Sequence, residues 1–128
     1  AQVAEASRQW IAQLDPEAWQ PTNPPGAEYP LDPSVRLTVV SWQRCTAMTD
    51  SQAVAYRADL PPSHSTALLF VIRTRQGRQL PAIPPTVPDS TTGNVCIGVW
   101  KNGGCLYVLV VPGSPSDYRR TLRTQSVA

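Results

Sequence analysis

The sequence predicts one α+β domain, residues 1–128, in which an antiparallel sheet built from two hairpins and an N-terminal strand packs against helices at both chain ends. Two pairs of apolar segments are each joined by a short polar turn, with no helix-length segment inside a pair. This order favours antiparallel pairing. The fourteen prolines cluster between the elements, where they stiffen two extended arms. We expect a helix and arm over 1–33, a sheet core over 34–112 and a C-terminal helix over 114–125.

The chain opens with an amphipathic pattern, AQVAEASRQWIAQL, in which Trp10 belongs to an apolar stripe at helical spacing. Asp15 and Pro16 are typical of the cap and the first position of a second helical turn, which would carry Trp19. The next segment, QPTNPPGAEYPLDP, has no usable period. We expect it to wrap the surface as a proline-stiffened arm.

Three strands are expected in the first half of the sheet core. The β-branched content of Ser34–Trp42 predicts a strand, and the polar letters RCTAMTDSQ that follow predict a loop or irregular edge. Residues Ala53–Leu60 alternate between apolar and polar side chains, which indicates a half-exposed strand. Residues Ala67–Ile72 are apolar on both faces, which indicates a central strand.

The letters NVCIGVWKNGGCLYVLVV predict a second hairpin, because two apolar runs flank a polar turn. Asn102-Gly103 is expected at the turn centre, since both central residues of a type I′ turn need positive φ. This register places Cys96 opposite Leu109. Cys96 and Cys105 would then share a face about 13 Å apart, which is too far for a disulfide.

A second proline arm and a terminal helix complete the expected elements. The letters LPAIPPTVPDSTTG are too irregular for helix or sheet, and we expect Leu80, Ile83 and Val87 to pin this arm on the core. Ser114 is suited to an N-cap and Pro115 to the first helical position. The arginines of this C-terminal helix would face solvent.

The sequence contains no motif that would make the chain an enzyme or give it a cofactor. Cys45, Cys96, Cys105 and His64 could supply four zinc ligands, but no CxxC or HxxxH pair sets the geometry. We favour buried hydrophobic roles for the cysteines and an exposed turn for His64. Paired carboxylates, a GxSxG elbow and phosphate-binding glycine loops are all missing. A disulfide from Cys45 to Cys96 or to Cys105 is left open.

The overall charge argues against a nucleic-acid partner. The formal net charge is +2 over 128 residues, so the attraction to phosphate would be weak. The chain begins with Ala1 rather than Met. We expect it to be a fragment or a mature product of a longer chain.

Several segments resemble the C-terminal region of bacterial membrane-anchored anti-sigma-factor-like proteins: RQWIAQLDPEAW, YPLDPSVR, AVAYRADLPP with ALLFVI and, above all, STTGNVCIGVWKNGGCLYVLVVPGSPSDYRRTL. In that family a cytoplasmic zinc-binding segment holds a sigma factor, a single membrane helix follows, and a sensor domain lies outside the cytoplasm. The resemblance is to the sensor end and loosely covers most of the chain. It implies a periplasmic or extracytoplasmic domain tethered to the membrane upstream of Ala1. The zinc segment and membrane helix lie outside this sequence, and no functional residue carries over.

We therefore expect a non-enzymatic sensory or interaction domain of a membrane-anchored transcription regulator. Its partner would be a protein or a protease in the envelope, and the proline arm would offer the partner an edge. Tryptophan is typical of core boundaries and protein interfaces. The candidate partner surface comprises Trp10, Trp19, Leu80, Ile83 and Val87.

Two alternatives remain. The first is a small stand-alone enzyme or ligand-binding protein with a pocket between sheet and helices, lined by His64, Cys45, Tyr56 and Tyr107. A thiol pKa far below about 8.5 would favour it, and inert thiols would count against it. The second is a structural module of the envelope, in which Trp10 or Trp19 would be buried between copies of the chain.

Overall fold

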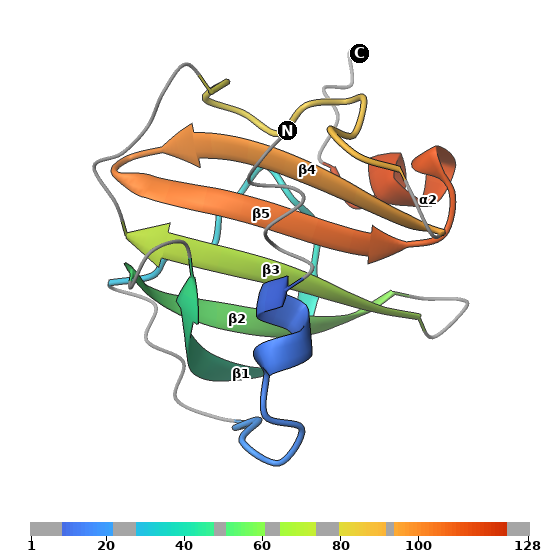
Figure 1. Cartoon of the computed structure of the whole chain (residues 1–128). Helices are drawn as coiled ribbons and strands as arrows, with labels where there is room; N and C mark the ends of the chain where they lie inside the picture. The colour runs from blue at the N-terminus through green and yellow to red at the C-terminus, as the bar shows by residue number, and fades with distance from the viewer. Residues whose placement is uncertain are drawn as a thin grey trace.

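The computed structural model describes residues 9–21, 28–47, 51–60, 65–73, 80–91 and 94–122. Five antiparallel strands form one open sheet in the order β1-β2-β3-β5-β4 (Figure 1). They are β1 (Thr38–Ala47), β2 (Ser51–Leu60), β3 (Ser65–Arg73), β4 (Val95–Asn102) and β5 (Cys105–Pro112). A helical segment over residues 9–13 precedes the strands, and α2 (Pro115–Arg120) follows them. The predicted α+β class with an antiparallel sheet and a helix near each end is confirmed at this level.

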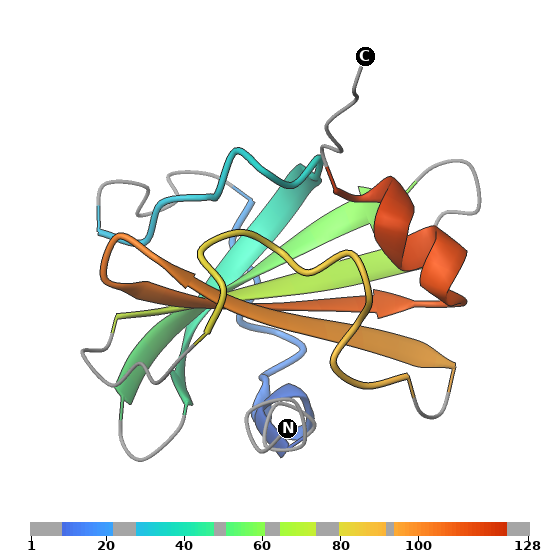
Figure 2. The ribbon, with the colours of Figure 1, turned by 90° about the horizontal axis from the view of Figure 1, so that it is seen from above.

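The sheet is covered on both faces by different parts of the chain. Figure 2 shows the N-terminal helical segment on one side of the sheet, and the segment before β1 together with α2 on the other. We name these the front face and the back face, as they lie in Figure 1. Because side chains alternate along each strand, β3 and β5 contribute to both cores. Leu69 and Leu109 pack in the back core, whereas Phe70 and Val108 pack in the front core.

Strand β1 extends further than the sequence pattern predicts. It begins at Thr38 rather than Ser34 and runs to Ala47, so the predicted loop after Trp42 is wrong. The polar residues of this stretch belong to an edge strand whose backbone pairs with β2. Cys45, for example, pairs with Ala53. Such a strand needs no apolar alternation when tertiary contacts satisfy its side chains. A bulge lies between Val39 and Ser41, and bulges commonly re-aim edge strands.

The turn between β4 and β5 lies one residue later than predicted. Asn102 pairs with Cys105, so the two central turn residues are Gly103 and Gly104, with φ of 63° and 82°. Two glycines adopt these angles without the steric cost that Asn102 would incur. Cys96 consequently faces Val111 rather than Leu109.

All three cysteines are free. Cys96 and Cys105 belong to the back core, whereas Cys45 packs against the front core. The sheet itself therefore separates Cys45 from both of its predicted disulfide partners, and neither bridge can form in this fold.

The C-terminal helix begins as predicted but ends earlier. Ser114 is the N-cap and Asp117 completes a capping box. The helix stops at Thr121 rather than near residue 125, because Leu122 turns away to form a bridge with Val35. Residues 123–128 lie outside the described part of the chain.

Candidate functional site

Residues 80–91, here called the edge segment, lie along the outer edge of β4. The amide of Lys101 donates to the Pro81 carbonyl at 2.9 Å, and Ile97 exchanges hydrogen bonds with Ser90. The Asp89 carboxylate accepts from the amide of Val99 at 2.7 Å. An unpaired sheet edge exposes donors and acceptors to other chains. The edge segment satisfies much of the β4 edge and is itself held in place.

A contact between α2 and the edge segment fixes the middle of that segment. The buried Tyr118 hydroxyl donates to the Pro85 carbonyl at 2.8 Å. The ring reaches this position because it crosses Gly98 of β4, where a Cβ would overlap the Tyr118 hydroxyl. The neighbouring Pro84 is buried. The prolines of the segment therefore face the sheet rather than solvent in its central part.

Two apolar side chains of the edge segment point into solvent between these fixed points. Ile83 is 64% exposed and Val87 is 72% exposed. We call this pair the Ile83–Val87 ridge. Leu80 is half-buried and packs against the front core. The prediction that all three residues pin the arm on the core therefore holds for Leu80 and is wrong for the other two.

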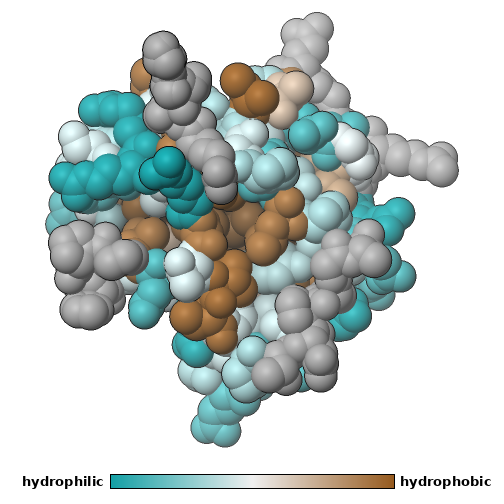
Figure 3. All heavy atoms as spheres, turned by 180° about the vertical axis from the view of Figure 1, so that it is seen from behind, coloured by the Kyte–Doolittle hydropathy of each residue, from teal (hydrophilic) through white to brown (hydrophobic). Residues whose placement is uncertain are grey.

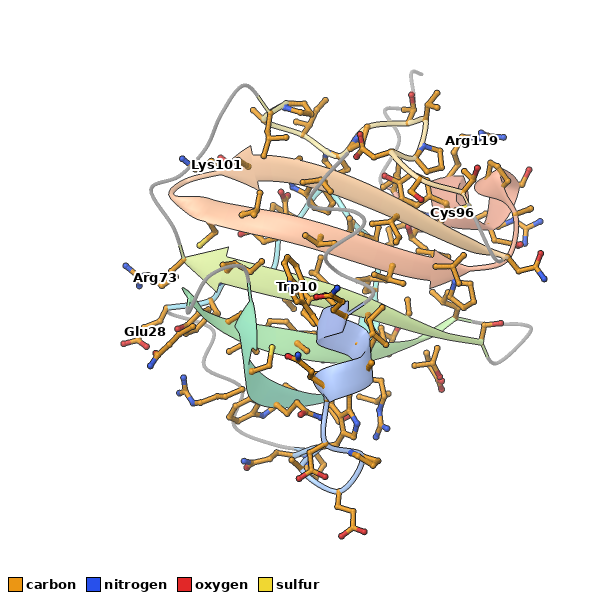
Figure 4. All side chains as sticks on the ribbon, viewed as in Figure 1. Trp10, Glu28, Arg73, Cys96, Lys101 and Arg119 are labelled. Atoms are coloured by element: carbon orange, nitrogen blue, oxygen red, sulfur yellow. The ribbon has the colours of Figure 1, made fainter. Side chains whose placement is uncertain are left out.

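The two tryptophans of the predicted partner surface lie elsewhere. Trp10 is only 6% exposed and meets the edge of Phe70 at 5.6 Å between ring centroids. Figure 4 places it between the helical segment and the sheet. Trp19 is half-buried, and the Arg57 guanidinium lies 4.6 Å above its ring.

The five residues of the predicted partner surface do not form one patch. Trp19 contacts Arg57 of β2, and β2 lies three strand positions from β4 and the ridge. At about 4.8 Å per strand, this separation is about 14 Å. Trp10 stabilises the front core and offers almost no surface. Within the predicted surface, the two residues of the ridge are largely exposed, whereas Trp19 and Leu80 are half-buried.

The thiols are unsuited to nucleophilic chemistry. Burial raises the pKa of the Cys45 thiol to about 11 and also raises the pKa of Cys96 and of Cys105. A reactive cysteine needs the opposite shift. Within the described residues no cluster of three or more metal-ligating side chains occurs. His64 of the predicted zinc and catalytic sets lies outside the described residues.

The tyrosines of the alternative ligand pocket serve another role. The Tyr56 hydroxyl donates to the Tyr29 carbonyl at 2.6 Å, and the Tyr107 hydroxyl donates to the Pro30 carbonyl at 2.9 Å. Burial raises the phenol pKa of both residues, so both stay protonated donors near neutral pH. Cys45 lies across the sheet from them. Of the described members of that predicted pocket, the structure brings Tyr56 and Tyr107 together on the back face and leaves Cys45 on the opposite face.

A groove whose lining differs from that of the predicted pocket lies on the back face. It encloses about 640 Å³ beside α2 and is lined in part by Val35, Leu37, Leu60, Pro112, Asp117 and Arg120. Figure 3 shows apolar side chains gathered near the middle of this face, with polar ones around them. Asp117 and Arg120 form an ion pair at 3.3 Å on the rim. The lining comes from four separate parts of the chain, so no local pattern could have revealed it.

Comparisons with known proteins give no further guide to the site. No family model, curated protein or solved structure matches this chain. In the part of the chain that the structure describes, no helix is long and apolar enough to cross a membrane.

Proposed function

We propose that this chain is a non-enzymatic interaction domain of a membrane-anchored, anti-sigma-factor-like regulator, acting outside the cytoplasm through a protein partner or protease. The Ile83–Val87 ridge is its contact surface. The resemblance of the sequence to sensor domains of that class supports the regulatory part of this proposal. The ridge supports the interaction part.

One observation carries the proposal: two large aliphatic side chains are exposed on a segment that is otherwise fixed. Exposed aliphatic residues on a mobile loop would lose conformational entropy on binding. Here the backbone is held at Pro81, Pro85 and Ser90 by hydrogen bonds to β4 and α2. A partner would therefore meet the ridge in one geometry. It would bury Ile83 and Val87 at about 1.5–3 kcal/mol for each side chain.

The thiol chemistry favours this proposal over an enzyme that uses cysteine. Each of the three thiols has a raised pKa. The tyrosine hydroxyls that could orient a ligand are engaged by the chain itself. The side chains of the ridge, by contrast, are largely exposed in the described part of the chain.

Site-specific photocrosslinking tests the proposal. A photoreactive phenylalanine analogue would replace Ile83 or Val87 in the full-length protein in its native cell. Val40 on β1 is the matched control, because it is also apolar and 42% exposed. We expect the same adduct from both ridge positions and none from position 40.

Mass spectrometry would then identify the adduct. Crosslinks at 83 and 87 that match those at 40 in identity and yield would contradict the assignment of the ridge. A single envelope protein or protease captured at both ridge positions would support it.

A further inference from the structure

Residues 28–35 cross the back face without forming part of the sheet. In the described part of the chain, residues 28–34 make no backbone–backbone hydrogen bond to any strand. Side chains of three different strands hold the segment instead. They are Tyr56 of β2, Tyr107 of β5 and Trp100 of β4. We call these three side chains the aromatic cradle.

The side chains of the cradle donate hydrogen bonds to successive acceptors along the segment. Tyr56 donates to the Tyr29 carbonyl and Tyr107 to the Pro30 carbonyl. The indole Nε1 of Trp100 donates to the Asp32 carboxylate at 2.6 Å. The other carboxylate oxygen accepts from the amide of Ser34 at 2.8 Å.

Three side chains of the segment are buried in the described structure, and the third, Val35, is 7% exposed and joins the back core where the segment ends. Tyr29 is 4% exposed and Asp32 is 3% exposed. The residues around them face solvent, and Leu31 is 44% exposed although it is aliphatic. Tyr29 and Asp32 are thus two buried anchors three residues apart, and the sheet donates a hydrogen bond to the Pro30 carbonyl between them. A linear peptide bound to a protein shows the same arrangement. Extended proline-containing peptides bind aromatic grooves in this way because their backbone carbonyls remain free.

The sheet positions the side chains of the cradle. Trp100 and Tyr107 stack at 5.3 Å with 10° between their planes, and both sit in paired strands. The contacts at the N-terminal end of the segment are weak, whereas at its C-terminal end Val35 forms a bridge with Leu122. Arg73 Nη1 reaches the Glu28 carbonyl only at 3.5 Å (Figure 4), and the Arg44 guanidinium lies 5.9 Å above the Tyr29 ring.

We propose that the aromatic cradle is a recognition site for an extended segment of another polypeptide with the pattern aromatic–proline–any–acidic, and that residues 29–32 occupy it in cis. The cis segment lowers the apparent affinity for the partner by competing at an effective concentration in the millimolar range. A partner segment therefore binds only when it outcompetes Tyr29 and Asp32. This site is distinct from the ridge.

Hydrogen exchange on the wild-type chain provides the first test. The indole N–H of the buried Trp100 donates to the Asp32 carboxylate, so its exchange reports release of the segment. We expect this indole N–H to open at least about 100-fold more often than the amides of Leu69 and Val108, because release would be a local opening. Equal protection of the indole N–H and these two amides would mean that the segment leaves only on global unfolding, and would overturn the proposal.

A peptide of sequence EYPLDPSV provides the second test. It would be titrated by fluorescence anisotropy against the chain carrying Tyr29→Ala and Asp32→Ala, which removes both cis anchors. We expect saturable binding that is at least about tenfold tighter than to the wild-type chain, where the cis segment competes. The peptide EAPLAPSV should bind at least about tenfold more weakly, since it lacks both anchors.

A matched control changes an exposed position instead. The chain with Leu31→Ser keeps its cis anchors and should bind EYPLDPSV as weakly as the wild type does. We call the chain with Tyr29→Ala and Asp32→Ala the anchor-free chain. The proposal would be overturned if this chain bound EYPLDPSV and EAPLAPSV equally well. It would also be overturned if EYPLDPSV bound equally well to the anchor-free chain and to the wild type. If the anchor-free chain does not fold, the exchange experiment on the wild-type chain decides.

Discussion

Replacing Gly98 by alanine should destabilise the protein through one contact, that with Tyr118. A Cβ at this position would overlap the Tyr118 hydroxyl and lie 2.7 Å from the ring carbon Cζ. The backbone of Gly98 does not need glycine, because its φ lies outside the left-handed range. The cost must therefore come from displacement of the ring, which also breaks the 2.8 Å bond to the Pro85 carbonyl.

The size of the effect follows from these two terms. Overpacking a buried site costs about 1–3 kcal/mol, and the lost hydrogen bond costs about 1 kcal/mol. Alanine recovers about 0.5–1 kcal/mol by reducing the entropy of the unfolded chain. We expect Gly98→Ala to lower the free energy of unfolding by about 2–3 kcal/mol. With an m-value of about 2 kcal/mol/M, the urea midpoint would fall by about 1–1.5 M.

A double-mutant cycle with Tyr118→Phe isolates the contact. The phenylalanine variant should lose about 1 kcal/mol with the hydroxyl. The double variant should lose at least about 1 kcal/mol less than the sum of the single losses, because the overlapping oxygen is gone. Gly103→Ala is the matched control, since a Cβ there meets no atom within 4 Å and only its positive φ adds a cost. A wild-type midpoint for Gly98→Ala, or additive losses in the cycle, would refute this reasoning.

Three further predictions concern the anchors, the ridge and the thiol. Asp32→Ala should lower the free energy of unfolding by about 3 kcal/mol, because it leaves the Trp100 indole N–H buried without an acceptor; an unchanged urea midpoint would contradict this. Ile83→Ser with Val87→Ser should change stability by less than about 0.5 kcal/mol, since both side chains are exposed, and a large loss in thermal melts would place the ridge in the core. The pKa of Cys45 is raised to about 11 in the folded chain. The contribution of this raised pKa to the free energy of unfolding is full below about pH 9, where the thiol of the unfolded chain also keeps its proton. This contribution is lost as the pH rises towards 11. Urea titrations of the wild type and of Cys45→Ser should therefore converge over that range, and a constant difference would exclude this linkage.

The sheet was predictable where side-chain periodicity is strong, and less so where tertiary contacts replace it. Residues Ala67–Ile72 show by composition alone that they form a central strand. The end of β1 could not be predicted in this way, because its polar residues are typical of a loop. There the buried Gln43 side chain exchanges hydrogen bonds with the backbone of Asp15 at 2.9 and 3.1 Å. A partner 28 positions away in sequence cannot be read from a local pattern.

The turn register and the candidate sites show the same limit. Both Asn102-Gly103 and Gly103-Gly104 suit a type I′ turn, so turn chemistry alone did not separate two registers one residue apart. Asp32 stands beside a proline and reads as a turn residue, whereas its carboxylate is buried under Trp100. Ile83 was expected on the core because aliphatic residues are usually buried. Its exposure depends on which face of the edge segment meets β4, which is set by Tyr118 and Pro85.

The measurement that tests the regulator proposal most directly is the sequence of the reading frame upstream of Ala1. We expect an apolar span of about 20 residues, preceded by a short cytoplasmic segment rich in histidine and cysteine. That result would join the Ile83–Val87 ridge to a membrane anchor and a sigma-factor-binding segment. A cleavable secretory signal, or a start codon immediately before Ala1, would contradict the membrane-anchored regulator.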